Sequence, residues 1–201
     1  MEMKYKNIIL RDMRESDIDD EIRWNTVETA WALWDAPWEM EEYLRNFDPE
    51  KHRLNALKEL GEDPDEPRWG FEIDYNGIHI GSVNSYCIDE NWDWISVNHI
   101  KPGQKVYRAI GIEINESHFW SRGIGPQALM MFIRYLLENG IGDICLQTWS
   151  GNARMMGCAR KLGFEECHRE TGNRIVRGGT YDGMTFLLDT DRFAAYLAQN
   201  P

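Results

Sequence analysis

The chain has 201 residues, of which 42 % are hydrophobic, and it carries a formal net charge of −12. This length suits one compact α/β domain, so we expect residues 1–201 to form a single domain with an ordinary core. A strongly acidic chain is poorly suited to bind nucleic acid or an anionic membrane, and no apolar run is long enough to span a bilayer. Because residues 1–13 lack an apolar stretch of signal-peptide length, we expect a cytoplasmic protein.

The acidic residues are concentrated in the first half of the chain. Residues 1–99 contain 24 acidic and 10 basic residues, whereas residues 100–201 contain 10 acidic and 12 basic residues. This asymmetry suits a cationic substrate on one side and an anionic cofactor on the other, and it equally suits a solubilising acidic surface.

The four cysteines predict neither a zinc site nor a disulfide framework. Cys87, Cys145, Cys158 and Cys167 have no CxxC spacing and no nearby histidine pattern. Reduced thiols fit a cytosolic protein, and we expect no metal ion.

The first elements in chain order are a strand and a helical region. Residues 7–13 predict a strand, and the Ser-Asp pair before Ile18 is expected to cap a helix that begins there. Apolar residues at three- and four-residue spacing predict that most of 23–47 is helical, with an interruption at Pro37. A further short helix is expected to end at Gly61.

The rest of the chain alternates strands and helices. Strands are expected at 68–75, 78–89, 106–114, 143–149, 164–170 and 180–189, and helices at 126–139, 152–162 and 191–201. The Asn-Gly pair at 76–77 predicts a hairpin turn, whereas residues 89–105 show no clear pattern. This order predicts an α/β protein with helices packed on a mixed sheet.

The strongest local pattern is the turn Arg122-Gly123-Ile124-Gly125-Pro126. Two glycines let the backbone curl so that several N–H groups point the same way, and the proline suits the first position of a helix. The helix dipole adds partial positive charge to these amides, which is the recipe for a phosphate or pyrophosphate site. A tight strand-to-helix connection without a ligand would use the same glycines.

The same glycines also fit a dinucleotide-binding fingerprint, with Ala128 as its third small residue. The context argues against it, because the turn follows a hairpin rather than opening a series of βαβ units. Thr148 and Trp149 stand where the acidic residue of that fingerprint is expected. A nucleotide-dependent oxidoreductase is therefore disfavoured.

Two segments in order resemble a known family. ESHFWSRGIGPQAL is similar to motif A of the GNAT superfamily of acetyl-CoA-dependent acetyltransferases, and NARMMGCARKLGFEE is similar to its motif B. The Phe-Trp-Ser-Arg-Gly form at 119–123 most resembles the branch that acetylates the N-termini of ribosomal proteins, and some aminoglycoside acetyltransferases carry a similar turn. The motifs cover residues 107–167. The resemblance implies a mixed, mostly antiparallel, V-split sheet of six to seven strands flanked by helices.

The resemblance also implies how acetyl-CoA would be bound as cosubstrate. Its pyrophosphate would contact the backbone amides of 122–125, its pantetheine would run beside the strand 109–114, and Asn152 would hydrogen-bond the pantetheine. Asn152 also fits a helix N-cap, and the two roles are compatible. The expected cofactor-binding residues are Ile112, Ile114, Arg122, Gly123, Ile124, Gly125 and Asn152.

The sequence departs from the family pattern at two positions. Trp120 replaces the usual Gln or Arg, as in the N-terminal-acetylating branch. Ala159 stands where many members have the tyrosine that protonates the leaving thiolate. The general acid is therefore an open question, for which Tyr181 and His118 are the candidates; Tyr181 also fits an edge or core position.

Glu113 is the leading candidate for the general base, because it interrupts an otherwise apolar strand near the expected cofactor. A solvent-facing strand residue fits the same alternation, and Glu116 could instead cap the glycine turn. For acceptor binding we expect Trp31, Trp34 and Asp35, which offer aromatic faces and a carboxylate to a cationic amine. Trp31 also fits a core position.

The sequence therefore predicts an acetyl-CoA-dependent N-acetyltransferase. Its acceptor would be a primary amine, on a cationic small molecule or a peptide N-terminus, that attacks the thioester directly in a ternary complex. The alternative is an acyl-CoA-binding or sensing module whose catalysis has decayed, which Ala159 permits. The sequence leaves both a monomer and a homodimer open.

Overall fold

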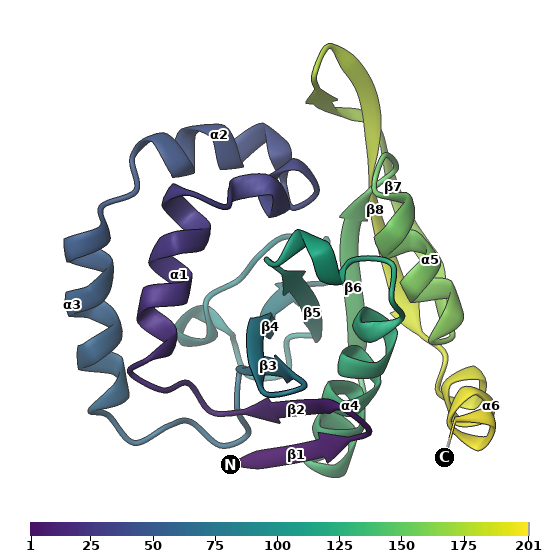
Figure 1. Ribbon diagram of the computed structural model, residues 1–201. Coiled ribbons are helices and arrows are strands. Elements are labelled where there is room, and N and C mark those ends of the chain that lie inside the picture. The colour runs from purple at the N-terminus through teal and green to yellow at the C-terminus, as the bar shows by residue number, and fades with distance from the viewer. Residues whose placement is uncertain (201) are drawn as a thin grey trace. The chain divides into compact units, whose positions relative to one another are not determined.

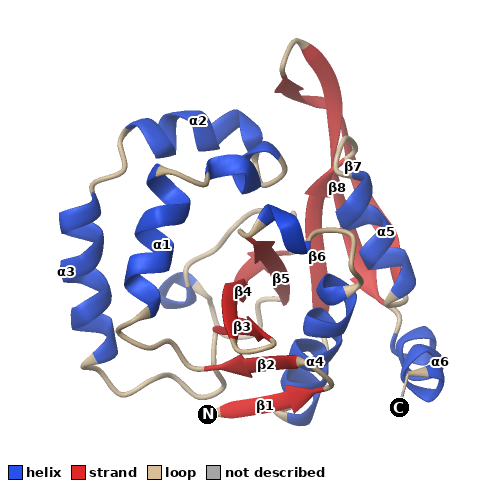
Figure 2. Ribbon diagram, in the orientation of Figure 1, coloured by secondary structure: helices blue, strands red, loops and turns tan. Residues whose placement is uncertain are grey.

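The computed structural model describes residues 1–200, which form helices and strands in mixed order (Figures 1 and 2). The strands are β1 Glu2–Tyr5, β2 Ile8–Arg11, β3 Gly70–Tyr75, β4 Ile78–Asp89, β5 Val106–Ile114, β6 Ile144–Trp149, β7 Phe164–Val176 and β8 Gly179–Leu188. The α-helices are α1 Asp17–Thr26, α2 Pro37–Arg45, α3 Pro49–Leu60, α4 Ile124–Glu138, α5 Ala153–Lys161 and α6 Thr190–Gln199. Among these described residues, no helix combines the length and the apolar character needed to cross a membrane.

The strands form one mixed sheet in the order β1-β2-β3-β4-β5-β6-β8-β7. β1 pairs with β2, β2 with β3, β6 with β8 and β7 with β8, all antiparallel. β5 and β6 pair in parallel at Arg108–Ile144 and Ala109–Cys145. The mixed, mostly antiparallel sheet is thus confirmed. It has eight strands rather than six to seven, because Glu2–Tyr5 adds an edge strand that the sequence analysis missed.

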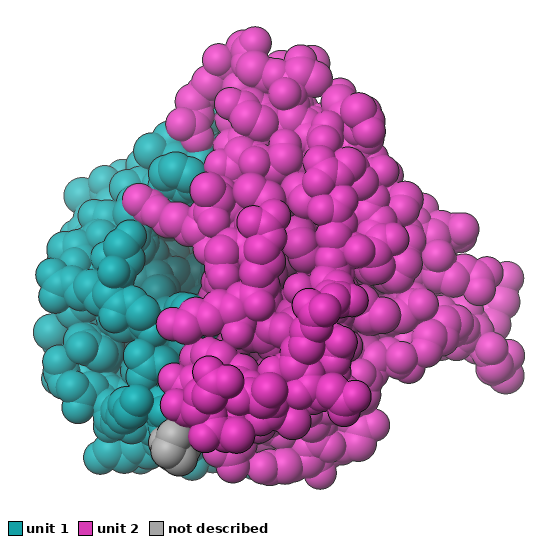
Figure 3. Space-filling view, turned by 90° about the vertical axis from the view of Figure 1, so that its right-hand side faces the viewer, with its two compact units in different colours: residues 1–83, 112–131 teal, residues 84–111, 132–201 magenta. Residues whose placement is uncertain are grey.

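The described chain divides into two compact units, which are coloured separately in Figure 3. The first unit comprises residues 1–83 and 112–131, and the second comprises residues 84–111 and the chain from residue 132 onward. The boundaries fall inside β4, β5 and α4, so neither unit is one continuous stretch of sequence. The single domain expected from chain length stays a prediction.

Each unit has its own buried apolar residues, placed by the alternation of strands and by one face of each helix. In the first unit the fully buried side chains include Ile8, Leu10, Ile18, Ile73 and Ile80. In the second unit Phe132, Ile133, Leu136, Ile144 and Leu146 have no accessible surface. The helix predicted at 126–139 thus buries Phe132, Ile133 and Leu136.

The predicted helical region before Pro37 is partly wrong. α1 ends at Thr26, and a short 3₁₀ helix at Thr29–Leu33 follows it. The cap also differs: the helix begins at Asp17, and the Ser16 side chain makes no cap hydrogen bond. The carboxylate of Asp17 is not a cap either. It accepts a hydrogen bond from the backbone N–H of Arg14, before the helix, at 2.7 Å and another from the buried Arg11.

The helix after the glycine turn begins two residues earlier than expected, at Ile124. Pro126 is therefore the third helical residue and not the first. Its missing N–H still costs nothing, because the first four N–H groups of an α-helix have no partner within the helix. The helix α5 is confirmed with Asn152 as its N-cap, whose Oδ1 accepts from the Met155 N–H at 3.1 Å.

Candidate active site

The glycine turn joins the end of β5 to the start of α4 within the first unit. Gly123 has φ +76°, which an L side chain rarely adopts, and the helix begins at the next residue. The Trp120 indole N–H donates to the carbonyl of Ile114 at 2.6 Å and so ties the turn to the end of β5. Trp120, which replaces the family's usual Gln or Arg, therefore has a structural role in holding the turn.

Gly125 lets two strand side chains lie against the turn. A Cβ atom on Gly125 would lie 3.9 Å from the Cδ1 of Ile112 and 4.0 Å from the Cδ1 of Ile114. Both isoleucines of β5 therefore face the turn, and Glu113 between them faces the other side of the sheet. The structure thus brings together the predicted residues Ile112, Ile114 and Gly125.

On that other side, Glu113 lines a cavity of about 270 Å³ inside the first unit. The cavity lining is Glu21, Trp24, Asn25, Trp31, Asp35, Met40, Tyr43, His52, Glu72, Ser82, Glu113 and Asn115. These described residues include four carboxylates and three aromatic rings but no lysine or arginine. The cavity therefore suits a ligand that carries positive charge.

A close approach between β4 and β5 sets the position of Glu113. A Cβ atom on Gly81 would lie 2.0 Å from the carbonyl oxygen of Glu113, so only glycine fits there. The N–H of Asn115 donates to the carbonyl of Ile80 at 2.9 Å and holds the strands together just beyond this point. Glu113 thus sits on strand backbone that its neighbours constrain.

The pKa of Glu113 is raised from 4.5 to about 8. Burial is the largest cause, and the negative charges of Asp35, Glu72 and Glu21 add to it, whereas a hydrogen bond with Asn115 opposes it. A carboxyl group whose pKa lies near neutral pH can release and accept a proton under physiological conditions, which is the property of a general base.

The neighbouring carboxyl groups are shifted in the same direction. Burial, and then the charge of Glu39, raises the pKa of Asp35. Burial and the charge of Glu72 raise the pKa of Glu21, although Glu21 is hydrogen-bonded to His52 at 2.8 Å. Repulsion among these groups is relieved when a cation enters the cavity.

One buried acceptor in the cavity wall has no partner. Asn25 donates through Nδ2 to the carbonyl of Glu21 at 2.8 Å, but its Oδ1 is buried and makes no hydrogen bond within residues 1–200. An unpaired buried acceptor is costly, so its position at a cavity favours a ligand that donates a hydrogen bond.

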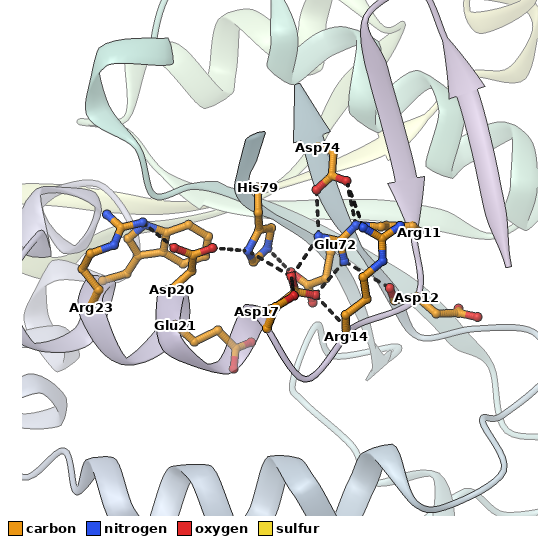
Figure 4. Close-up of polar contacts among 12 residues, drawn as sticks. Arg11, Asp12, Arg14, Asp17, Asp20, Glu21, Arg23, Glu72, Asp74 and His79 are labelled. Atoms are coloured by element: carbon orange, nitrogen blue, oxygen red, sulfur yellow. Dashed lines mark hydrogen bonds and ion pairs between the residues drawn. The ribbon is translucent and has the colours of Figure 1, made fainter. Parts of the chain in front are cut away.

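Hydrogen bonds and ion pairs connect Glu72 to a network of polar side chains from β2, β4 and α1 (Figure 4). His79 hydrogen-bonds Glu72 at 2.8 Å and Asp20 at 3.1 Å, and Arg11 bonds both Asp17 and Asp74. Sequence analysis missed Glu72, although its place between the buried Phe71 and Ile73 marks a side chain on the opposite face of the strand.

The three predicted acceptor residues are not all at the cavity. Trp31 and Asp35 line it, whereas Trp34 is absent from the described lining. Trp31 is also a core residue, because it is 7 % exposed and its indole N–H donates to the carbonyl of Trp24 at 2.9 Å. Both interpretations of Trp31 therefore hold.

The remaining candidates near Glu113 have other partners. Glu116 accepts hydrogen bonds from Arg23 at 2.6 Å and from the Trp24 indole at 3.0 Å, so its predicted role as a cap of the glycine turn is wrong. His118 is exposed, and its ring packs on Phe119 with centroids 4.2 Å apart.

Tyr181 and Ala159 belong to the second unit. The ring of Tyr181 packs edge-on against Trp149, with centroids 4.9 Å apart. Ala159 has no accessible surface, so the position of the family's tyrosine is occupied here by a buried methyl group.

Comparison with known proteins identifies the class. Residues 7–165 match the model of the Acetyltransferase (GNAT) domain family. This match covers most of the chain, so the protein belongs to the GNAT family of acetyltransferases. No curated protein matched the sequence.

Solved structures show the same fold at low identity. A GNAT-family acetyltransferase from Bacillus anthracis is 13 % identical with a TM-score of 0.65, over 95 % of this chain and 99 % of that chain. RimL, a ribosomal L7/L12 alpha-N-protein acetyltransferase in complex with coenzyme A, is 18 % identical with a TM-score of 0.65. The match covers 95 % of this chain and 100 % of RimL. The protein yncA from Salmonella typhimurium, solved with its cofactor acetyl-CoA, is 18 % identical with a TM-score of 0.61. The match covers 92 % of this chain and 94 % of yncA.

Proposed function

We propose that this protein transfers an acetyl group from acetyl-CoA to the primary amine of a cationic acceptor, either a small molecule or a peptide N-terminus. The observation that carries the proposal is Glu113, a carboxyl group with a pKa of about 8 in the wall of a carboxylate-lined cavity.

The glycine turn supports acetyl-CoA as the donor. The amides of Gly123, Ile124 and Gly125 stand at the start of a 15-residue helix, where the helix dipole and unpaired N–H groups favour a pyrophosphate. Arg122 beside them is exposed and adds positive charge. RimL and yncA, which share the fold, were solved with coenzyme A and acetyl-CoA.

The proposed reaction needs two protons to leave the acceptor nitrogen, one before it attacks the thioester and one as the amide forms, and the second balances the proton that the leaving thiolate gains. The amine arrives as an ammonium ion, and Glu113 takes a proton from it, directly or through a water molecule. The neutral nitrogen attacks the thioester carbonyl, so an N–C bond forms while the C–S bond breaks and the thiolate leaves. Tyr181 is the proposed donor of a proton to that thiolate, and Asn152 the proposed partner of pantetheine; both assignments rest on the resemblance and on residue chemistry.

The cavity accounts for the choice of acceptor. Asp35, Glu21 and Glu72 supply negative charge, the rings of Trp24 and Trp31 supply faces for a cation, and Asn25 Oδ1 supplies an unpaired acceptor. A cationic amine provides both the charge and the N–H donors that these groups lack.

The test is release of free thiol from acetyl-CoA across polyamines, an aminoglycoside, basic peptides and an alcohol that cannot become cationic. For the best amine, Glu113→Gln should lower kcat by about 100-fold or more. It should also remove a rise in kcat/KM with pH that has its midpoint near pH 8 in the wild type. Glu138→Gln, an exposed change on α4, is the control.

Two results would count against the proposal. If Glu113→Gln keeps wild-type turnover and pH dependence, Glu113 is not the base. If acetyl-CoA raises the melting temperature while no amine is acetylated, the result supports the sensing alternative, which Ala159 permits.

A further inference from the structure

His79 on β4 is buried and has a carboxylate at each ring nitrogen (Figure 4). Its Nε2 lies 2.8 Å from Glu72 Oε2, and its Nδ1 lies 3.1 Å from Asp20 Oδ2 and 3.6 Å from Asp17 Oδ1. An ionised carboxylate only accepts hydrogen bonds, whereas a neutral imidazole has one donor nitrogen and one acceptor nitrogen. Both contacts with carboxylates are hydrogen bonds only when both ring nitrogens carry hydrogen, as they do in the imidazolium cation.

The carboxylates around His79 come from two elements, α1 and β3, and differ in whether they have another cationic partner. On α1, Asp17 is bonded by Arg11 at 2.6 Å and Asp20 by Arg23 at 2.7 Å, so each already has a guanidinium partner. On β3, Glu72 has its hydrogen bond from His79. The cation is therefore most important for Glu72.

Two further observations agree with a charged His79. Burial by itself would lower its pKa, but the hydrogen bond and charge of Glu72 and the charge of Asp17 outweigh burial and raise it. The Trp24 ring is tilted by 54° to the His79 ring, and the two centroids are 4.7 Å apart, within the range of cation–π contacts.

Glu72 connects this buried cation to the cavity. Its side chain is 13 % exposed and lines the same cavity as Glu113. With one carboxylate oxygen held by His79, its orientation in the wall is restricted.

We propose that His79 is a positioning residue, which as an imidazolium holds Glu72 as the fixed anion that binds the acceptor's ammonium group. The two glutamates then have different roles: Glu72 binds the ammonium group, and Glu113 exchanges the proton. This inference rests on the proposed function.

Kinetics of the acceptor are the first test. Glu72→Gln and His79→Gln should each raise KM for the amine about tenfold or more and leave kcat within about threefold. The double variant should be no worse than the poorer single variant, because both changes break one unit. His79→Lys, which restores a cation, should recover part of the loss, and the exposed His99→Gln is the control.

The pH profile is the second test, because a merely structural role would not move it. The charge of Glu72 helps to raise the pKa of Glu113. Glu72→Gln should therefore move the acid limb of kcat/KM to lower pH, and His79→Gln, which leaves Glu72 without its cation, should move it to higher pH.

Nitrogen NMR of the wild-type protein keeps the inference testable if variants fail to fold or no amine is turned over. Both ring nitrogens of His79 should remain protonated at pH 7.5. A neutral imidazole at that pH, or an unchanged KM in a folded His79→Gln variant, would overturn the inference. Loss of all turnover in the wild type would instead count against the proposed function and leave the NMR result to decide the state of His79.

Discussion

Two groups of carboxylates in the first unit have opposite electrostatic surroundings. Asp17 and Asp74 share the guanidinium of Arg11, which donates to Asp17 at 2.6 and 2.9 Å and to Asp74 at 2.8 Å from two nitrogens. Glu113 and Asp35 line a cavity whose described walls contain neither arginine nor lysine.

The pKa values of Asp17 and Glu113 are shifted in opposite directions for this reason. Burial by itself would raise the pKa of Asp17, but hydrogen bonds from Arg11 and the Arg14 backbone outweigh it and lower that pKa. Burial and neighbouring negative charge both raise the pKa of Glu113, to about 8. A buried carboxylate with its own cation serves stability, whereas one without a cation is available for a ligand that brings the positive charge.

Removing Arg11, the cation shared by the first group, should have the largest effect on the free energy of unfolding. Arg11→Gln leaves two buried carboxylates without their main partner, and it is expected to lower the free energy of unfolding by about 3–5 kcal/mol. Urea unfolding at pH 7 measures this. Arg45→Gln, which breaks an exposed pair with Glu41 on α2, is the control and should change little. A loss for Arg11→Gln no larger than the control would contradict the contrast drawn between the two groups.

Removing the carboxyl group of Glu113, in the second group, should change the free energy of unfolding by less and in the opposite direction. A group whose pKa is raised on folding contributes stability that is fully present below its unfolded pKa and lost as the pH rises through its folded pKa. For Glu113 this window runs from 4.5 to about 8. Glu113→Gln should therefore gain stability over the wild type across that window, by about 1–3 kcal/mol at its upper end.

The measurement is urea unfolding of both proteins at several pH values between 4 and 9. A difference in free energy that does not change across this range would show that Glu113 titrates normally in the folded protein.

Reducing the negative charge around Glu113 should have the smallest effect. Asp35→Asn removes the largest charge contribution to the raised pKa of Glu113, so the acid limb of kcat/KM should move to lower pH by roughly half a unit. Glu42→Gln, an exposed change on α2, should leave the limb in place. A limb that moves equally in both variants would mean that overall charge, rather than Asp35, sets the pKa.

Local features of the site could be predicted from the sequence because they depend on adjacent residues. The turn at 122–125 and the Asn152 cap follow from glycine, asparagine and helix periodicity over a few positions. The apolar spacing was less reliable, because it predicted that most of 23–47 is α-helical, whereas α1 ends at Thr26 and a 3₁₀ helix follows.

The identity of Glu113 as a candidate base was predicted, but its environment was not. Its alternation along β5 fits both a solvent-facing and a cavity-facing side chain. The outcome depended on Asp35, Glu72 and Gly81, which are 78, 41 and 32 residues away in the chain. No local pattern specifies such distances.

The sequence by itself determined the family, through two motifs in order, and the elements on which they lie. Tertiary structure decided which carboxylates are compensated, because desolvation and Coulomb interactions depend on groups that folding brings together. Arg11 meets Asp74 across 63 residues and neutralises it, while Glu113 meets acids and aromatic rings. That difference is why the pKa of Glu113 is raised while that of Asp17 is lowered.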